Sequence, residues 1–452
     1  MHTIDPSTGK KIKSYAQTSR TKVDDILKNA QKSFLMWRSF SFKDRGFMFK
    51  QVGGFLRTHE DRYASLMALE MGKPLSQGKG EIEKCAQLCD FYADYTDEFL
   101  SDHEIKTDAV KSYVTYDPLG IILAVMPWNF PFWQVFRCAV PAMMAGNAVI
   151  LKHASNVCGC AIEIENIFKE IGFPRQLFSN VIVPSEKVKD LIEHPLIAAV
   201  SLTGSTQAGK SIATHAGGVL KKCVLELGGS DPYIVLEDAD IDHAVSKCVA
   251  SRMINAGQSC ISAKRFIIVD SAFKEFEEKF VSQMQLQRMG LPTYEGIDLG
   301  PLARHDLRDS LQAQVQKSIN QGARLILGGK IPDDRGAFYP PTVLTNVKSG
   351  MVAYTQELFG PVASLLKVKD EKEAIKVAND TVFGLGSAIF TGDLARAERL
   401  SHELEAGACF VNDLVRSDQR LPFGGIKQSG YGRELSRDGI KEFVNIKTVY
   451  IK

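Results

Sequence analysis

Apolar and polar positions alternate along the chain in a strand–helix–strand order that predicts an α/β fold. The amino-terminal region has the helical period, and we expect helices at 22–37, 43–58, 60–71 and 77–100. Short apolar runs follow and predict strands at 112–116, 121–126, 148–152, 180–183, 198–203, 222–226 and 233–235. Helical stretches such as 158–171 and 205–216 lie between most of these strands, so we expect a parallel sheet covered on both faces.

The alternation continues in the second half and predicts a second α/β domain. We expect helices at 240–256, 271–285, 303–320 and 370–378, and strands at 265–269, 324–327 and 363–368. At 452 residues the chain is long for a single domain and long enough to bury a large core.

The most apolar segment, 119–151, could be mistaken for a membrane span. Proline, asparagine, glutamine and arginine interrupt it at Pro127, Asn129, Pro131, Gln134, Arg137 and Pro141. No clean run of about 18 apolar residues remains. The segment therefore predicts a buried strand, a loop, a buried helix and a second strand, and no membrane partner is expected.

Composition narrows the class of protein further. Apolar residues make up 44% and charged residues 24% of the chain, as in soluble globular proteins, and the net charge of +2 gives no support for nucleic-acid binding. Nine irregularly spaced cysteines indicate reduced thiols and a cytoplasmic location. The pairs Cys158/Cys160 and Cys85/Cys89 lack a matching second pair of ligands, so no metal is expected. The amino terminus has no apolar signal segment.

Four loops carry the residues that suggest chemistry, because ligands of parallel α/β sheets bind at the carboxyl ends of strands. The glycine turn at 204–210 could hold a phosphate, although such a turn is more often structural. The dinucleotide-binding fingerprint GxGxxG occurs nowhere in the sequence. Glu226 ends a strand beside two glycines, where desolvation would raise the pKa of its carboxyl towards the range of a general base. The alternative is a solvated loop glutamate. Asn129 could stabilise an oxyanion or cap a helix. Cys260, in the fourth loop NAGQSC, has no histidine or second cysteine within ten positions.

Six motifs in one order connect these loops. MPWNFP, SLTGSTQAGK, LELGGSDP, NAGQSC, ELFGPV and LPFGGIKQSGYGRE extend over about 300 residues, and with them the chain resembles the aldehyde dehydrogenase superfamily. The segments MPWNFPFWQVFR, LKHASNVCGCA, KKCVLELGGSDPYIV and AKRFII resemble the short succinate-semialdehyde dehydrogenases of bacteria.

The resemblance implies the aldehyde dehydrogenase fold, an α/β architecture in three parts. A Rossmann-like cofactor-binding domain would comprise 1–100 and 119–228, and an α/β catalytic domain 229–430. The segments 101–118 and 431–452 would form a small β-element for oligomerisation, which implies a homodimer or a homotetramer.

The resemblance also assigns catalytic roles. Cys260 would be the nucleophile that attacks the aldehyde, and the Asn129 amide with the Cys260 backbone N–H would hold the oxyanion. Glu226 would activate the water that hydrolyses the thioester. A CoA-acylating relative would use the same fold and cysteine, but that branch typically lacks the glutamate at 226.

Cofactor contacts follow from the same motifs. The positions that would bind the dinucleotide are Trp128, Lys152, Ser155, Gly204, Ser205, Leu227, Glu357 and Phe359. Many members that prefer NAD have glutamate where Ser155 stands, because a carboxylate accepts both ribose hydroxyls and repels a 2′-phosphate. Serine beside Lys152 removes this repulsion, which favours NADP while leaving NAD usable.

Substrate contacts are implied at two positions. Arg137 matches the arginine that succinate-semialdehyde dehydrogenases use for the distal carboxylate, although a structural ion pair would also explain it. Ser417 would be a second carboxylate contact. Ile254 stands where some members have a second arginine, with Arg252 two positions away, and Ser262 replaces the cysteine of a redox switch.

The expected activity is the oxidation of succinate semialdehyde to succinate with NADP or NAD. Two alternatives stay open at this point. One is a dehydrogenase of another small aldehyde such as glutarate semialdehyde, and the other is a non-catalytic cofactor-binding protein on the same fold.

Overall fold

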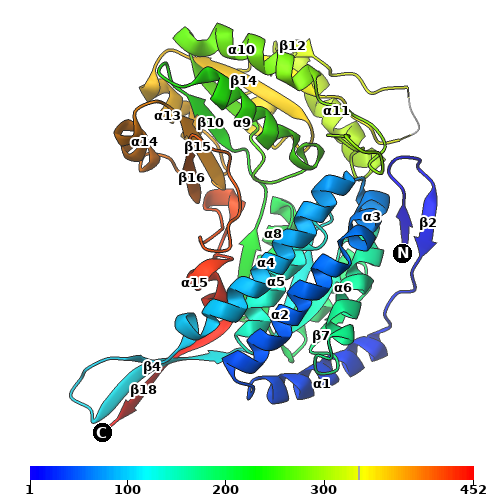
Figure 1. Ribbon diagram of the computed structural model, residues 1–452, viewed down its shortest axis with the longest axis vertical. Coiled ribbons are helices and arrows are strands. Elements are labelled where there is room, and N and C mark those ends of the chain that lie inside the picture. The colour runs from blue at the N-terminus through cyan, green and yellow to red at the C-terminus, as the bar shows by residue number, and fades with distance from the viewer. Residues whose placement is uncertain (334–335) are drawn as a thin grey trace.

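The computed structural model describes residues 1–333 and 336–452, which form two α/β lobes and a projecting β-arm (Figure 1). The first lobe is built on a six-stranded sheet with the order β17-β9-β8-β5-β6-β7. Its five parallel strands are β5 (Ile121–Met126), β6 (Ala148–His153), β7 (Phe178–Asn180), β8 (Ile197–Thr203) and β9 (Lys222–Glu226). Strand order reverses between β5 and β8, and a ligand crevice is expected at the carboxyl ends beside such a reversal.

Helices of the first lobe come mainly from the amino-terminal half. They are α1 (Arg20–Trp37), α2 (Phe42–Thr58), α3 (Glu60–Met71), α4 (Leu75–Leu100), α5 (Trp133–Met144), α6 (Cys158–Glu170), α7 (Val188–Glu193) and α8 (Thr206–Gly218). Every residue of α5 is buried, as expected for a helix that is apolar on all sides. The interrupted apolar segment is thus a core strand, a loop and a core helix. Among the described residues, no helix combines the length and apolarity needed to cross a bilayer.

The second lobe is built on a seven-stranded sheet with the order β12-β13-β14-β11-β10-β15-β16. The strands are β10 (Pro232–Val235), β11 (Arg265–Val269), β12 (Arg324–Leu327), β13 (Thr342–Thr345), β14 (Val362–Val368), β15 (Gly386–Phe390) and β16 (Ala408–Val411). All neighbours are parallel except β12 and β13. The helices are α9 (Ile241–Met253), α10 (Asp270–Gln285), α11 (His305–Asn320), α12 (Val352–Thr355), α13 (Glu371–Asn379) and α14 (Leu394–Ser401). The α/β class predicted from the alternation is confirmed.

The β-arm is an antiparallel sheet that projects from the first lobe (Figure 1). It contains β3 (His103–Glu104), β4 (Lys111–Pro118) and β18 (Val444–Ile451), and the last two pair along their whole length. The carboxyl-terminal segment reaches the arm through β17 (Gly430–Tyr431), which joins β9, and α15 (Ser436–Ile440). Strands β1 (His2–Ile4) and β2 (Lys11–Ser14) form a separate hairpin.

Two sequence-based expectations near Cys260 are wrong. The helix expected at 240–256 ends at Met253, because Asn255 and Ala256 have positive φ values of 53° that an α-helix cannot contain. The NAGQSC loop also does not follow a strand. It connects α9 to the start of β11, so Cys260 lies at the amino end of the second sheet.

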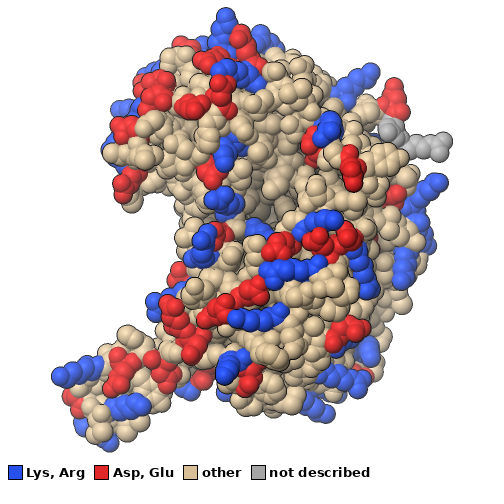
Figure 2. All heavy atoms as spheres, viewed as in Figure 1, with Lys and Arg blue, Asp and Glu red and all other residues tan. Residues whose placement is uncertain are grey.

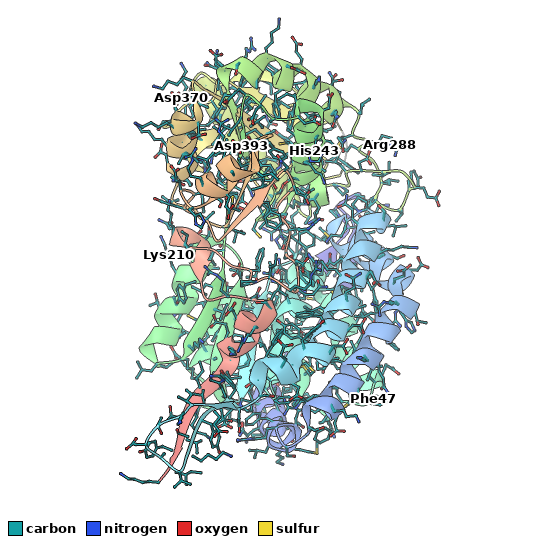
Figure 3. The ribbon with its side chains drawn as sticks, turned by 60° about the vertical axis from the view of Figure 1, so that its left-hand side comes forward. Phe47, Lys210, His243, Arg288, Asp370 and Asp393 are labelled. Carbon is teal, nitrogen blue, oxygen red and sulfur yellow. The ribbon has the colours of Figure 1, made fainter. Side chains whose placement is uncertain are left out.

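The two sheets have separate cores, and the surface charges are mixed. One buried apolar cluster runs from Val23 to Leu227 with a few carboxyl-terminal side chains, and the other from Tyr233 to Val415. Figure 2 shows acidic and basic side chains interspersed on one face and a hollow between the lobes. Figure 3 marks Phe47 on α2 in the first lobe and His243 on α9 in the second.

Candidate active site

Cys260 lines a cavity of about 290 Å³ between the lobes. Its mainly apolar lining includes Phe130, Trp133, Ile254, Ile261 and Phe423, and its polar side chains include Gln77, Glu81, Lys84, Gln134, Arg137 and Ser417. The contributing elements are α4, the β5–α5 connection, α5 itself, the nucleophile loop (residues 254–264) and the segment after β16. A concave, mainly apolar space with a few polar groups beside a thiol is the usual form of a small-molecule site.

A left-handed turn precedes the cysteine. Asn255, Ala256 and Gly257 have φ values of 53°, 53° and 73° in succession. Left-handed backbone costs roughly 1–2 kcal/mol for each residue with a side chain. At Gly257 a Cβ would also lie 2.3 Å from the Gly360 backbone, so only glycine fits there. Backbone strain of this kind concentrates at functional sites, where surrounding contacts maintain it.

Asn255 supplies such contacts and joins the nucleophile loop to the loop after β5. Its side-chain Nδ2 donates to the Asn129 carbonyl (2.7 Å) and to the Gln258 carbonyl (3.2 Å), while its backbone N–H donates to Gln77 Oε1 (2.8 Å). Asn129 Nδ2 donates to the same Gln258 carbonyl (3.0 Å). An amide nitrogen carries two hydrogens, so Asn129 keeps one donor for a further acceptor.

Lys264 fixes the far side of the nucleophile loop. Its ammonium group donates to the carbonyls of Ser259, Cys260 and Ser262 at 2.9–3.0 Å. The same Nζ lies 3.5 Å from Glu357 Oε1. Although Lys264 is buried, its three donors are all satisfied, and the loop that carries the thiol is held in one geometry.

The Cys260 thiol is partly buried, and burial raises its pKa to about 12. Arg137 and Lys264 oppose this rise, while Glu357 and Glu226 add to it. The thiolate is the nucleophilic form. The thiol of the structure therefore needs a base or an added positive charge before it can attack.

Glu226 has the environment that such a base needs. It ends β9, is 2% exposed, and neither of its carboxyl oxygens has a hydrogen-bond partner in the described residues. Burial, followed by the nearby Glu434 carboxylate, raises the pKa of Glu226 well above its usual range. The desolvation expected from the sequence is present. Glu226 does not itself line the cavity that contains Cys260.

Arg137 lines the cavity and is also paired. It forms a buried ion pair with Glu434, donates to Thr203 Oγ1 (3.4 Å), and its guanidinium lies 4.6 Å from the centre of the Phe423 ring. The structural ion pair that was an alternative explanation for Arg137 therefore exists, and Arg137 also lines the cavity. Ser417 is buried at the same cavity and accepts a hydrogen bond from Lys84 Nζ (2.6 Å).

The residues that differ from the family pattern have other partners. Arg252 is fully buried and donates to the Gly257 carbonyl (2.5 Å), so its charge supports the left-handed turn. Ile254 contributes an apolar side chain to the cavity. Ser262 donates to the Ser251 carbonyl (2.7 Å), away from the Cys260 thiol.

The expected contacts for the adenosine end of a dinucleotide lie together after β6. Lys152 is 8% exposed, and no described carboxylate comes within 4 Å of its ammonium group. Burial lowers the pKa of Lys152, as expected for a cation without an ion pair. Ser155 is exposed three residues further on. A buried unpaired cation next to an exposed hydroxyl fits a phosphate.

The turn after β8 requires a correction. The Gly204 N–H donates to the Glu226 carbonyl (2.9 Å), because β8 and β9 are parallel with Thr203 opposite Glu226, so this amide cannot hold an anion. Ser205 is the N-cap of α8 and accepts from the Ala208 N–H (3.3 Å). The first amides of α8 have no partner within the helix, and they are the groups of this turn that could bind an anion.

The remaining cofactor positions lie near the same crevice. Trp128 and Phe359 make an edge-to-face contact with ring centres 5.8 Å apart, across the two lobes. Glu357 Oε1 accepts from the Gly229 N–H (3.1 Å). The Leu227 side chain is buried close to Gly209 of α8.

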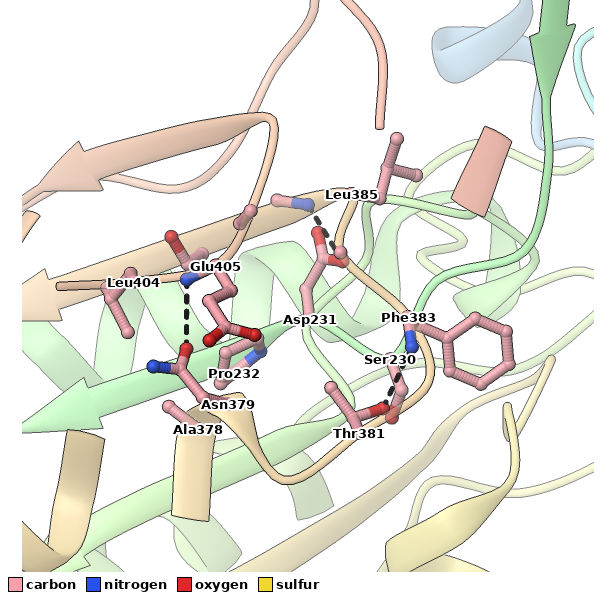
Figure 4. A pocket seen from close by; sticks show the side chains of 14 residues that line it. Ser230, Asp231, Pro232, Ala378, Asn379, Thr381, Phe383, Leu385, Leu404 and Glu405 are labelled. Carbon is pink, nitrogen blue, oxygen red and sulfur yellow. Dashed lines mark hydrogen bonds between the residues drawn. The ribbon is translucent and has the colours of Figure 1, made fainter. Parts of the chain in front are cut away.

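A second, much smaller pocket lies at the amino ends of β10 and β15 (Figure 4). Its volume is about 10 Å³, enough for one water at most. Asp231 Oδ1 accepts from the Gly386 N–H (3.1 Å), and Asn379 Oδ1 accepts from the Glu405 N–H (2.9 Å). Burial raises the pKa of Asp231 to about 7. Among the described residues, no group of three or more His, Cys, Asp or Glu is placed to hold a metal ion.

Comparison with known proteins identifies the family. The profile described as "Aldehyde dehydrogenase family" matches residues 1–449. This chain belongs to the aldehyde dehydrogenase family. It is 48% identical over 449 residues to the probable NADP(+) succinate-semialdehyde dehydrogenase of Synechocystis, covering 99% of both chains. It is 45% identical over 447 residues to the NAD(P)+ succinate semialdehyde dehydrogenase of Escherichia coli, covering 99% of this chain and 97% of the other.

Solved structures of the family share the whole fold. The succinic semialdehyde dehydrogenase of Streptococcus pyogenes, crystallised in complex with NADP+, has a TM-score of 0.97 at 37% identity, with 100% of this chain and 99% of the other covered. The family and the fold inferred from the six motifs are confirmed.

Sequence reasoning missed four residues of this aldehyde dehydrogenase site: Asn255, Lys264, Lys84 and Glu434. Asn255 was hidden because its segment was assigned to a helix. Lys84 was one of several charges between the apolar positions of the helix expected at 77–100, and nothing local distinguished it. Lys264 and Glu434 lay inside quoted motifs, but their partners are from 2 to nearly 300 residues away in the chain.

Proposed function

We propose that this chain oxidises succinate semialdehyde to succinate, with NADP+ as the preferred acceptor and NAD+ as a usable one. The observation that carries the proposal is the composition of the cavity at Cys260, where three cationic side chains, Lys84, Arg137 and Arg416, interrupt an apolar lining. An aldehyde with a carboxylate at its far end matches this combination of a thiol, a short apolar wall and positive charge. The named activity of the similar proteins supports the same substrate.

The reaction begins at Cys260. Loss of the thiol proton gives a thiolate whose sulfur bonds to the aldehyde carbon, and the carbonyl oxygen becomes an oxyanion. The free hydrogen of Asn129 Nδ2 and the Cys260 backbone N–H would stabilise that charge. NADP+, when bound, supplies the acceptor for the hydride that the carbon then loses.

Hydrolysis completes the cycle. Once the carbon is at the oxidation level of a thioester, Glu226 would take a proton from water, whose oxygen bonds to the carbon as the bond to sulfur breaks. Succinate leaves and the thiol is restored. A carboxylate with a raised pKa is the stronger base for this step.

The residues present fit NADP at both ends of the crevice. Lys152 and Ser155 would hold the 2′-phosphate, with Ser205 and the first amides of α8, beyond Gly204, at the pyrophosphate. Leu227, Glu357, Trp128 and Phe359 would surround the nicotinamide half.

Ser155→Glu should change the preference from NADP towards NAD. The carboxylate would repel the 2′-phosphate and remove a donor, which should cost about 2–4 kcal/mol, or roughly 30- to 1000-fold in kcat/KM for NADP. Ser155→Ala is the matched control, because it removes the donor without adding charge and should cost about fivefold. Steady-state kinetics with each dinucleotide measure both effects. A wild type that strongly prefers NAD would contradict this account of Ser155.

We also propose the domain division 1–100 and 119–228, 229–430, and 101–118 with 431–452, with the last pair as an oligomerisation element. In the arm, β18 is an edge strand, and its Ile446, Tyr450 and Ile451 side chains are exposed. Such an edge can pair with a second copy, as a homodimer or a homotetramer requires. A cytoplasmic location is consistent with nine free cysteines.

A panel of aldehydes tests the function. With NADP+ and no coenzyme A, kcat/KM for succinate semialdehyde should exceed that for butanal at least tenfold, and succinate should be the product. Butanal has the same carbon chain without the carboxylate. Higher kcat/KM with glutarate semialdehyde would make that aldehyde the proposed substrate. A strict need for coenzyme A would make the reaction an acylation of coenzyme A. If no aldehyde is turned over, the chain is not an aldehyde dehydrogenase in function.

A further inference from the structure

We propose that Lys84, on α4, is the side chain that binds the substrate carboxylate and thereby determines the preference for a semialdehyde. This inference rests on the proposed function, since it assigns a residue to the same substrate. It starts from a comparison of the three cations in the cavity wall, Lys84, Arg137 and Arg416, and of the acids that surround them. Arg416 is ion-paired with Asp413 (3.3 Å), and its side chain is 60% exposed, so its charge is both paired and solvated.

Arg137 already has a partner for its charge. Its guanidinium is ion-paired with Glu434, and both side chains are almost fully buried. A second carboxylate beside this pair would meet a group of net charge near zero. Arg137 therefore contributes less attraction to an anion than its position in the cavity suggests.

Lys84 has no such partner. No described carboxylate oxygen lies within 4 Å of its Nζ, which contacts only neutral groups: it donates to Ser417 Oγ (2.6 Å) and lies 4.2 Å from the centre of the Trp133 ring. The side chain is partly buried in the cavity wall. An ammonium group that is desolvated without a counter-ion is costly, and an anion in the cavity would offset that cost.

The nearest acids are occupied by other groups. Glu81, one turn earlier on α4, is ion-paired with Lys73, and its Oε1 accepts from the Phe132 and Trp133 N–H groups (2.8 and 2.9 Å). Asp418, next to Ser417, is bound by Arg420 at 2.6 Å. Neither carboxylate can turn to Lys84 without leaving a buried donor or a cation unpaired.

The electrostatics around Lys84 agree with this geometry. Burial and the Arg137 charge lower the pKa of Lys84 to about 8, while Cys85, Glu81 and Asp418 oppose the decrease. A bound carboxylate favours the protonated ammonium. Lys84 should therefore bind the substrate below about pH 8 and lose its charge above it.

Lys84→Met tests the proposal, because methionine keeps the length and removes the charge. We expect the ratio of kcat/KM for succinate semialdehyde to that for butanal to fall at least 30-fold, the loss typical of a desolvated charge pair. Lys84→Arg should restore most of this ratio. The matched control is Lys79→Met on the same helix, where Lys79 is partly exposed and pairs with Asp61 outside the cavity, and its ratio should stay within twofold of the wild type.

The pH dependence of the wild type is an independent measurement in case Lys84→Met folds poorly. The same ratio should fall as the pH rises through about 8, because titration of Cys260 and Glu226 affects both aldehydes and cancels. In Lys84→Arg the ratio should stay flat to pH 10.

The outcomes separate the two proposals. A wild type without preference for succinate semialdehyde over butanal would overturn the proposed function. A wild type with that preference, together with an unchanged ratio in Lys84→Met or no fall of the ratio near pH 8, would overturn only the role of Lys84.

Discussion

Cys260→Ala should abolish aldehyde oxidation, with kcat reduced on the order of 10⁴-fold or more. Among the residues that line the cavity, Cys260 supplies the only thiol, and the three carbonyls bound by Lys264 hold its loop without using the sulfur. Alanine should therefore leave the loop, the cavity and the dinucleotide crevice in place. The binding constant for NADP+, measured by fluorescence titration, should change less than threefold.

Cys409→Ala is the matched control for the loss of a thiol. Cys409 lies on β16, is only partly buried, and does not line the cavity. Its replacement should leave turnover near the wild-type value. A loss of kcat in Cys260→Ala much smaller than about 10⁴-fold would remove Cys260 from the mechanism.

Glu226→Gln should slow steady-state turnover by roughly 10²- to 10⁴-fold, the usual contribution of a general base. Glutamine keeps the shape of the side chain in a place where neither oxygen has a hydrogen-bond partner among the described residues, so the fold should be retained. If thiol ionisation persists, stopped-flow absorbance should detect a rapid burst of reduced cofactor, near one per site, followed by slow hydrolysis. Absence of the burst would instead make Glu226 the base for Cys260. Turnover equal to wild type would exclude both roles.

The pH profile supplies a second readout for Glu226. Burial and Glu434 raise the pKa of Glu226, so at a given pH more of this carboxyl is protonated, and unable to accept a proton, than of an exposed glutamate. The wild-type kcat should therefore increase with pH over a range that lies above the ordinary titration range of a glutamate. Glu226→Gln has no such group, and its slow turnover should lose this part of the dependence.

The sequence alone determined the fold class and the family. Strand–helix alternation follows from burial of apolar side chains on a sheet covered on both faces, which is a local property of the chain. The motifs around Cys260, Glu226 and Asn129 needed no tertiary information to be noticed. Glu226 could even be expected to be desolvated, because it ends an apolar strand beside two glycines.

Only the tertiary structure decided how these groups are held and which charges are free. The left-handed turn at Asn255 is stable because Asn129 and Gln77, more than 100 residues away, bind it, so local propensity predicted a helix instead. The Gly204 amide is occupied because β8 and β9 pair in one particular register. The same holds for ion pairs. Arg137 is paired with Glu434, nearly 300 residues later, whereas Lys84 has no counter-ion because its neighbouring acids are bound by other cations. Electrostatic partners depend on distances in space, and a sequence pattern records only distances along the chain.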